Sequence, residues 1–342
     1  MDSLTHLFVG GAIAAAIAPA GQRRAALLAG AALNTLPDLD VLPLMLSDDP
    51  VVRMTWHRAA THSLLVLPWI GLLLWWWFRS RGGRIAQAPR RWFWIFQCAL
   101  LSHPLLDAFT VYGTQLLWPL PVPPAMWSTL FIIDPLLTLP LVFACAIAWF
   151  ARGRGGTQVL VAGLSLGAAY LGWSILAKSL VDRAAQRSLA AMGLSDAPRF
   201  SVPMPFNTLL WRVVAMTPDG FVEGERSLVA DRGPMRFTYH SSDVEALAAA
   251  RGTPSGARLL WFNHHFAKAE VRNGQLVLTD LRMGAEPDYS FRFVVARRDG
   301  ERWREVRPQQ LRWPWQARSR LGDMWARIWQ EPAAGGGATS SP

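Results

Sequence analysis

The sequence contains very little cysteine. Only two cysteines occur among its 342 residues, Cys98 and Cys145, and each lies inside an apolar run. This scarcity excludes a disulfide framework and a zinc site of the CxxC type. A metal ion bound by this chain must therefore use histidine and carboxylate ligands.

Basic residues are missing from two informative places. The first six residues include Asp2 but no lysine or arginine, so the apolar run that follows lacks the basic start of a signal peptide. We predict a retained helix there. The segment from Val111 to Trp127 also has no basic residue. The net charge of +10 comes largely from arginines at the ends of apolar runs and in the tail, a placement that favours membrane anchoring over nucleic-acid binding.

Apolar sequence is abundant, and it is concentrated in the first half of the chain. The chain is 51% hydrophobic, with 18 tryptophans. The apolar runs cover residues 7–20, 25–36, 64–78, 92–106, 130–150 and 159–176. Several are shorter than the ~20 residues that cross ~30 Å of hydrocarbon, and tilt or tryptophan anchoring would make up the difference. We predict an α-helical polytopic membrane domain over residues 1–181.

The loop charges predict an orientation for this domain. If the apolar runs alternate across the membrane, the arginines of three loops fall on one side. They are Arg23, Arg24, Arg79, Arg81, Arg84, Arg90, Arg91, Arg152 and Arg154. The positive-inside rule makes that side the cytoplasm of a bacterial inner membrane. The histidines and aspartates of this half then gather on the periplasmic side, where the last run also exits.

Residues 182–312 have a different pattern. Alternating segments such as Tyr289–Val295, with turns at Asn273-Gly274 and Asp299-Gly300, predict antiparallel strands. We expect a small β-rich extracytoplasmic domain. His264 and His265 are neighbours on a predicted strand and so would point to opposite faces, where they cannot readily share a metal ion.

Residues 313–342 complete the chain. Trp315–Trp329 reads as a basic amphipathic helix that either lies on lipid or packs on its own domain. A disordered tail is expected after Pro332.

Histidines and aspartates of the membrane half form the candidate metal ligands. The set is His6, Asp38, Asp40, His57, His62, His103, Asp107 and Asp134. His103 and Asp107 are four residues apart on an apolar helix and therefore project from the same face. Taken singly, each residue has an ordinary alternative role: a satisfied hydrogen bond, an interfacial histidine or a helix cap. Their common position at the outer face favours metal binding.

Imidazole and carboxylate together suit Zn²⁺, and without a thiolate Mn²⁺ or Fe²⁺ is also allowed. Eight ligands are too many for one tetrahedral ion. We expect two or three ions.

The motifs resemble the YdjM-type family of bacterial membrane-bound proteins, described as metal-dependent hydrolases. The resemblance covers the first half of the chain. It rests on Asp2-Ser3-Leu4-Thr5-His6, Pro37-Asp38-Leu39-Asp40, His57-Arg58-x-x-Thr61-His62-Ser63, Ser102-His103-x-x-x-Asp107 and Ile133-Asp134-Pro135.

That family is similar, more distantly, to zinc-dependent phospholipase C and the S1/P1-type nucleases, which are α-helical enzymes with a trinuclear zinc cluster. The similarity implies a helical bundle of that type. The ligands it implies are His6, Asp40, His57, His103 and Asp107. The N-terminal tryptophan that ligates through its amine in those enzymes has no counterpart at Met1.

Such a cluster supports hydrolysis of a phosphodiester, because a metal lowers the pKa of bound water toward ~7. We assign catalytic roles to Asp40 and to Arg58, whose planar fork suits a pair of phosphate oxygens. Lipid-headgroup snorkelling is the alternative for Arg58. A membrane lipid or lipid-linked phosphate is the expected substrate, because the site opens where headgroups lie.

Two other functions compete with the hydrolase. The first is hydrolysis of nucleic acid on the outer face, which the nuclease similarity allows but which would need a basic groove beside the ligands. Nucleic acid is not expected as a partner, because the outer loops near the ligands carry only Arg53 and Arg58 as basic residues. The alternative from another class is a non-enzymatic metal-binding protein, either an ion permease or a scaffold. A transporter should place ionisable residues at mid-bilayer on opposed helices, whereas these gather at one edge.

Overall fold

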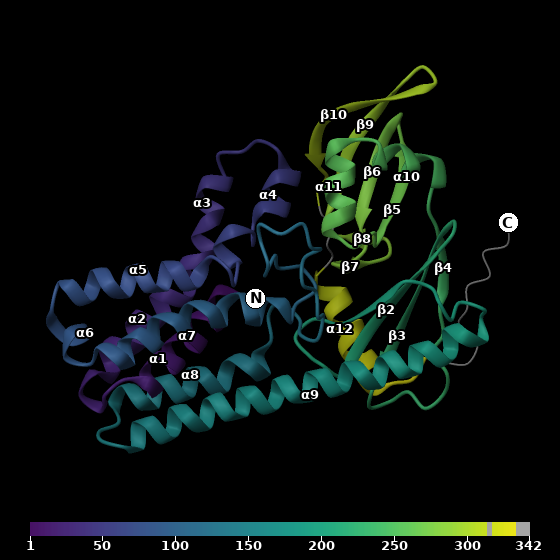
Figure 1. The fold of residues 1–342 in the computed structure, drawn as a ribbon. Helices are drawn as coiled ribbons and strands as arrows, with labels where there is room; N and C mark the ends of the chain where they lie inside the picture. Colours follow the sequence, from purple (N-terminus) through teal and green to yellow (C-terminus); the bar gives the residue numbers. More distant parts are fainter. Residues whose placement is uncertain (313–316, 333–342) are drawn as a thin grey trace. The chain divides into compact units, whose positions relative to one another are not determined.

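The computed structural model describes residues 1–312 and 317–332, which form two compact units (Figure 1). The first unit comprises residues 1–48, 52–127 and 132–173, and the second comprises 49–51, 128–131 and the described residues from Ser174 onward.

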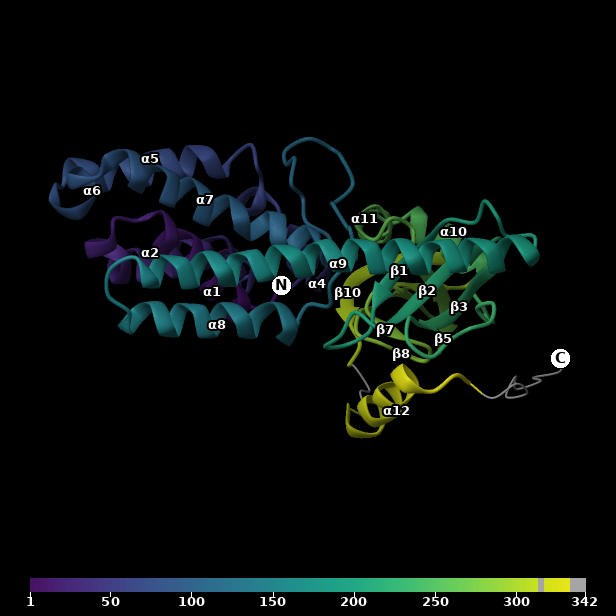
Figure 2. The same ribbon diagram turned by 90° about the horizontal axis from the view of Figure 1, so that it is seen from below.

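The first unit is helical. Its longer helices are α1 (Ser3–Ile17), α2 (Arg23–Thr35), α5 (Leu67–Ser80), α7 (Pro89–Ala108), α8 (Pro135–Phe150) and the first part of α9 (Gly155–Ala191). The short elements are η1 (Ala20–Gln22), η2 (Leu36–Asp40), α3 (Val41–Leu44), α4 (Pro50–Trp56), η3 (Ala60–His62) and α6 (Gly83–Gln87). The longer helices run side by side in both views (Figures 1 and 2).

Helices α1 and α2 pack unusually closely. A Cβ atom placed on Gly30 would lie 2.2 Å from the carbonyl oxygen of Gly10 and 2.3 Å from the Cβ of Ala14. Only glycine allows this approach of the two backbones. The contact brings the side chain of His6 on α1 within hydrogen-bond distance of Asn34 on α2.

The helices of the first unit run back and forth, so their ends fall into two groups (Figure 1). One end collects the start of α1, the end of α2, the end of α7 and the start of α8. The other end collects the start of α2, the segment around α6 and the turn between α8 and α9. The predicted ligands lie at or near the first group of ends, and the loop arginines lie at the second.

Two helical segments are long and apolar enough to cross a membrane, Ala20–Leu44 and Gly155–Ala191. Pro50–His62 and Leu67–Ser80 would supply a third crossing if they act together across their 57° bend. Ser3–Ile17 and Pro135–Phe150 are shorter apolar helices. A helical first half with membrane-spanning candidates is therefore confirmed. The number of crossings and the phospholipase C-like bundle stay predictions.

The second unit is rich in β-sheet, as predicted. One antiparallel sheet has the order β1-β2-β3-β4, a second has the order β10-β9-β6-β5, and β7 pairs with β8. The strands are β1 (Arg199–Pro203), β2 (Leu210–Thr217), β3 (Gly220–Ser227), β4 (Thr238–Ser241), β5 (Ala267–Arg272), β6 (Gln275–Asp280), β7 (Gly284–Ala285), β8 (Asp288–Tyr289), β9 (Arg292–Asp299) and β10 (Arg302–Gln310). Asn273 and Gly274 both have positive φ at the β5–β6 turn, which matches the hairpin predicted there.

Three further helices and the later part of α9 complete the second unit. Ala177, Val181 and Ala185 of α9 pack on Trp211 and Val213 of β2 to form one core. The helices are α10 (Val244–Arg251), α11 (Pro254–Phe262) and α12 (Ala317–Trp329).

Helix α12 packs on its own domain through its last turns. Ile328 is fully buried, and Arg327 forms two hydrogen bonds to Asp231, of 2.8 and 2.6 Å. Trp325 and Trp329 remain exposed. The predicted helix start at Trp315 and the predicted disordered tail after Pro332 lie outside the described residues.

The strand predicted around His264 and His265 is wrong. Leu259–Phe262 belongs to α11, and the two histidines follow it with positive φ angles of 56° and 64°. Thr253 caps this helix by accepting a hydrogen bond from the amide of Gly256, and Pro254 occupies its first position. Both features favour a helix start.

Candidate metal centre

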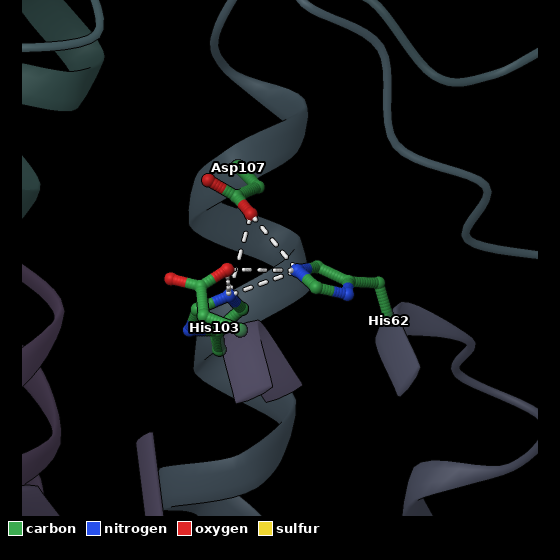
Figure 3. Close-up of side chains that lie close together, drawn as sticks. His62, His103 and Asp107 are labelled. Carbon is green, nitrogen blue, oxygen red and sulfur yellow. Dashed lines mark hydrogen bonds and ion pairs between the residues drawn. The ribbon is translucent and has the colours of Figure 1, made fainter. Parts of the chain in front are cut away.

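Four side chains converge at one end of the first unit. His103 and Asp107 lie on one face of α7, Asp38 lies on η2, and His62 ends η3. One ligand atom from each lies within 4.8 Å of all the others. Figure 3 shows His62, His103 and Asp107 pointing toward one another. Within the described residues this is the one group of its kind, and it unites segments far apart in sequence.

Five of the six distances between these ligand atoms are close to the edges of a tetrahedral site, and all six are within 4.8 Å. The Nε2 atoms of His62 and His103 are 3.0 Å apart, and the Asp107 Oδ2 atom lies 3.4 Å from each. The Asp38 Oδ1 atom lies 3.4 Å from His62 Nε2 and 3.3 Å from His103 Nε2. For zinc bonds of about 2.0–2.1 Å, the edge of a regular tetrahedron is about 3.3–3.4 Å. The side chains are therefore already spaced for a small divalent ion.

The outer nitrogen of each imidazole orients its ring. His103 Nδ1 lies 2.5 Å from the backbone oxygen of Asn34, which can only accept, so Nδ1 donates. His62 Nδ1 lies 3.0 Å from the Thr61 hydroxyl, whose own proton goes to Asp40 at 2.8 Å. In the neutral rings both Nε2 lone pairs therefore face the centre of the group, as they do in metal-binding histidines.

Asp107 uses its two oxygens differently. Oδ1 contacts the amino group of Met1, His6 Nε2 at 3.2 Å and Arg58 Nη2 at 3.1 Å. Oδ2 is fully buried and has no hydrogen-bond partner among the described residues. A buried carboxylate oxygen without a partner is costly. A cation bound by the four donors would satisfy it.

Burial gives the group one open side. His62, His103 and Asp107 have no exposed side-chain surface, whereas Asp38 is 20% exposed. Among the four side chains, Asp38 is therefore the one that solvent reaches.

Asp40 lies beside the group and not in it. Its carboxylate accepts hydrogen bonds from the Arg58 amide at 3.1 Å and from Thr61, and it contacts His57 Nδ1 at 2.8 Å. His57 thus pairs with Asp40 outside the four donors. These contacts let Asp40 fix the segment that supplies His62.

His6 lies against the four side chains and is not one of them. Its ring stacks on that of His103, with centroids 3.7 Å apart. Its Nδ1 lies 3.1 Å from the Asn34 side-chain oxygen, and Asn34 in turn donates to the Ala99 carbonyl and to Ser102. Asn34 therefore links three segments of the site. The sequence interpretation overlooked its role, although an amide within an apolar helix was a usable signal.

Asp134 caps α8, which was the ordinary alternative for it. Its side chain accepts hydrogen bonds from the amides of Leu136 and Leu137 and from the Tyr170 hydroxyl. It does not join the four donors.

Arg58 lies next to the group. Its guanidinium is buried, donates to Thr110 at 3.3 Å and stacks over the Tyr112 ring at 4.8 Å. Its Nε atom has no hydrogen-bond partner among the described residues. The backbone of Arg58 has a φ of 65°, which is unusual for a residue other than glycine.

The chain has recognisable relatives among known proteins. The chain is similar to the uncharacterized protein YfhP of Bacillus subtilis (strain 168), with 26% identity over 238 residues, which cover 66% of this chain and 68% of that protein. No solved structure matches the chain. Residues 1–181, which contain the whole histidine and aspartate group, match the YdjM inner membrane protein family. The chain therefore belongs to the YdjM inner membrane protein family.

Proposed function

We propose that this protein is a multi-pass inner-membrane hydrolase that cleaves a phosphodiester or a lipid-linked phosphate. A divalent ion, with Zn²⁺ first and Mn²⁺ or Fe²⁺ as alternatives, would be held by Asp38, His62, His103 and Asp107. The observation that carries the proposal is the convergence of four buried or half-buried ligand atoms within 4.8 Å of one another, one of which, Asp107 Oδ2, has no hydrogen-bond partner among the described residues.

The metal would supply a water molecule of lowered pKa and would stabilise charge on a phosphoryl oxygen. The side chains around it hold and orient the reactants. The two Nη atoms of Arg58 contact Asp107 and Thr110, and its buried Nε–H is suited to a phosphate oxygen. Asp40 positions His57 and, through Thr61, the ring of His62.

The site would face the periplasm. The four donors lie near one group of helix ends and the loop arginines lie at the other, which under the positive-inside rule is cytoplasmic. A reporter fused after Gly83 should be cytoplasmic, and one fused after Pro332 should be periplasmic. Finding both reporters in the cytoplasm would contradict this topology.

The competing proposal is a non-enzymatic protein that binds the same ion for transport or packing. The gathering of ionisable groups at one end of the helices supports the hydrolase over a permease. The partly exposed Asp38 supports it over a closed structural site, because catalytic metals keep an accessible position.

Turnover of a generic substrate tests the proposal. Purified protein should hydrolyse bis(4-nitrophenyl) phosphate in the presence of Zn²⁺ or Mn²⁺, and His103→Ala should reduce the rate to background. His265→Asn, which changes an exposed imidazole in the second unit, is the matched control and should retain the wild-type rate. Wild-type protein that binds metal without turnover would favour the scaffold.

A further inference from the structure

Exposed apolar side chains border the metal centre on the segment that carries Asp38. Leu39 lies between Asp38 and Asp40, and Leu42 and Met45 follow within and just after α3. The two aspartates are largely covered, with exposures of 20% and 9%, whereas these three apolar residues are 48–67% exposed. The segment therefore turns its charges inward and its apolar side chains outward.

A second segment presents the same chemistry. Leu117, Leu120 and Val122 are 42–52% exposed and lie in the loop that follows α7. No Asp, Glu, Lys or Arg occurs from Val111 to Trp127. We name Leu39, Leu42, Met45, Leu117, Leu120 and Val122 the apolar collar.

Hydrogen bonds fix both parts of the collar to the segment that supplies His62. The Gln115 amide donates to the Arg58 carbonyl at 3.0 Å, and the Leu64 amide donates to the Leu116 carbonyl at 2.8 Å. On the other side, the carboxylate of Asp40, next to Leu39, accepts from the Arg58 amide. The collar therefore borders the metal centre and is not a distant surface.

Water is a poor solvent for such a surface. Each Å² of apolar surface removed from water contributes ~25 cal/mol, and large exposed apolar patches in general mark an interaction site. The chain belongs to an inner membrane protein family, and Leu39 and Leu42 lie within the candidate span Ala20–Leu44. These observations indicate that the hydrocarbon of the membrane covers the apolar collar.

We propose that the apolar collar opens the metal centre sideways to the bilayer and holds the hydrocarbon chain of a lipid-linked phosphate. The phosphate group would then reach the four donors from the membrane, past the partly exposed Asp38. The assignment of a substrate rests on the proposed function, whereas the contact of the collar with lipid does not.

Spin-label accessibility tests the contact with lipid. Single cysteines at Leu42 and Leu120, in a Cys98→Ala and Cys145→Ala background reconstituted in phosphatidylglycerol-containing vesicles, should be more accessible to oxygen than to a water-soluble nickel chelate. A label at the exposed Phe143 of α8 is the lipid control, and one at the exposed Glu301 of the β9–β10 turn is the water control. Collar labels that are open to nickel, or closed to both reagents because a second chain covers them, would overturn the proposal.

Substrate preference tests the second half. Leu117→Asn with Leu120→Asn should lower by about tenfold or more the ratio of kcat/KM for phosphatidylglycerol in mixed micelles to kcat/KM for bis(4-nitrophenyl) phosphate. An unchanged ratio would overturn the role of the collar in substrate binding. If wild-type protein cleaves neither substrate, the proposed function fails, and the spin labels still decide whether the collar lies in lipid.

Discussion

The two units each bury a cluster of charged side chains, and the clusters differ in how their charges are compensated. In the second unit, Arg282 forms a two-bonded pair with Asp280, at 3.0 and 2.7 Å, and Lys268 donates to both oxygens of Glu286 at 2.8 Å. In the first unit, two imidazole nitrogens and two carboxylate oxygens face one another.

The difference separates structural charge from a binding site. A buried ion pair with complete hydrogen bonds needs no further partner. Two imidazole nitrogens and two carboxylate oxygens that face one another are stabilised by positive charge, supplied either as protons on the imidazoles or as a metal ion. The comparison therefore marks the group in the first unit as one that could hold a metal ion, and it gives the ion pairs of the second unit a structural role.

Removing one carboxylate from each cluster should have the largest effect and tests the difference between the two clusters most strongly. Asp107→Ala leaves Arg58 without its buried partner, and Asp280→Ala does the same to Arg282, so each should destabilise its own unit by about 3–5 kcal/mol. Only Asp107→Ala should also abolish metal binding. Thermal unfolding in detergent and elemental analysis measure the two effects. Metal loss in Asp280→Ala would contradict the separation.

Metal removal should have the next largest effect. A ligand present at 100 times its Kd stabilises the folded state by about 2.7 kcal/mol, so a chelator should lower the Tm of the wild type. The double variant His62→Ala with His103→Ala should be insensitive to the chelator. An equal shift in both proteins would place the stabilising ion elsewhere.

The contact between α1 and α2 offers a packing test. Gly30→Ala should destabilise the first unit by about 1–3 kcal/mol, because the added Cβ would overlap the backbone of Gly10. Gly172→Ala on α9 is the matched control, since no described atom lies within 4 Å of its added Cβ. Its Tm should stay the same or rise. An unchanged Tm for Gly30→Ala would show that the two helices pack less closely.

The hydrogen bond that orients His62 should have the smallest effect on stability. Thr61→Val removes the hydroxyl between His62 and Asp40 without much change in volume, and should weaken metal affinity by about 10–100-fold with little effect on Tm. Thr35→Val is the control, because that hydroxyl donates to the Ala31 carbonyl of its own helix. Metal competition with a fluorescent chelator measures the affinity. Equal losses in both variants would argue against orientation by Thr61.

The sequence was sufficient to predict a helical half with candidate membrane spans, a β-rich half, and histidines and aspartates that gather at one end of the helices in a group that could hold a metal ion. Helical geometry alone brings His103 and Asp107 to one face, and the arginines of the loops identify the opposite end.

Sequence spacing could not distinguish Asp38 from Asp40. The two residues lie on a 3₁₀ helix, where side chains two residues apart point in different directions, so only one of them faces the α7 pair. Sequence spacing also could not show that His62 joins the group and His57 does not, because η3 and the positive φ of Arg58 redirect the chain between them. The sequence pattern therefore indicates which histidines and aspartates are candidate ligands, and tertiary packing decides which of them come together.

The most direct test of the account is the metal content of protein purified in detergent without a chelator. Wild-type protein and His265→Asn should carry at least one equivalent of zinc, manganese or iron per chain, and His62→Ala with His103→Ala should carry almost none. A metal-free wild type that also fails to take up Zn²⁺ or Mn²⁺ on addition would contradict the account.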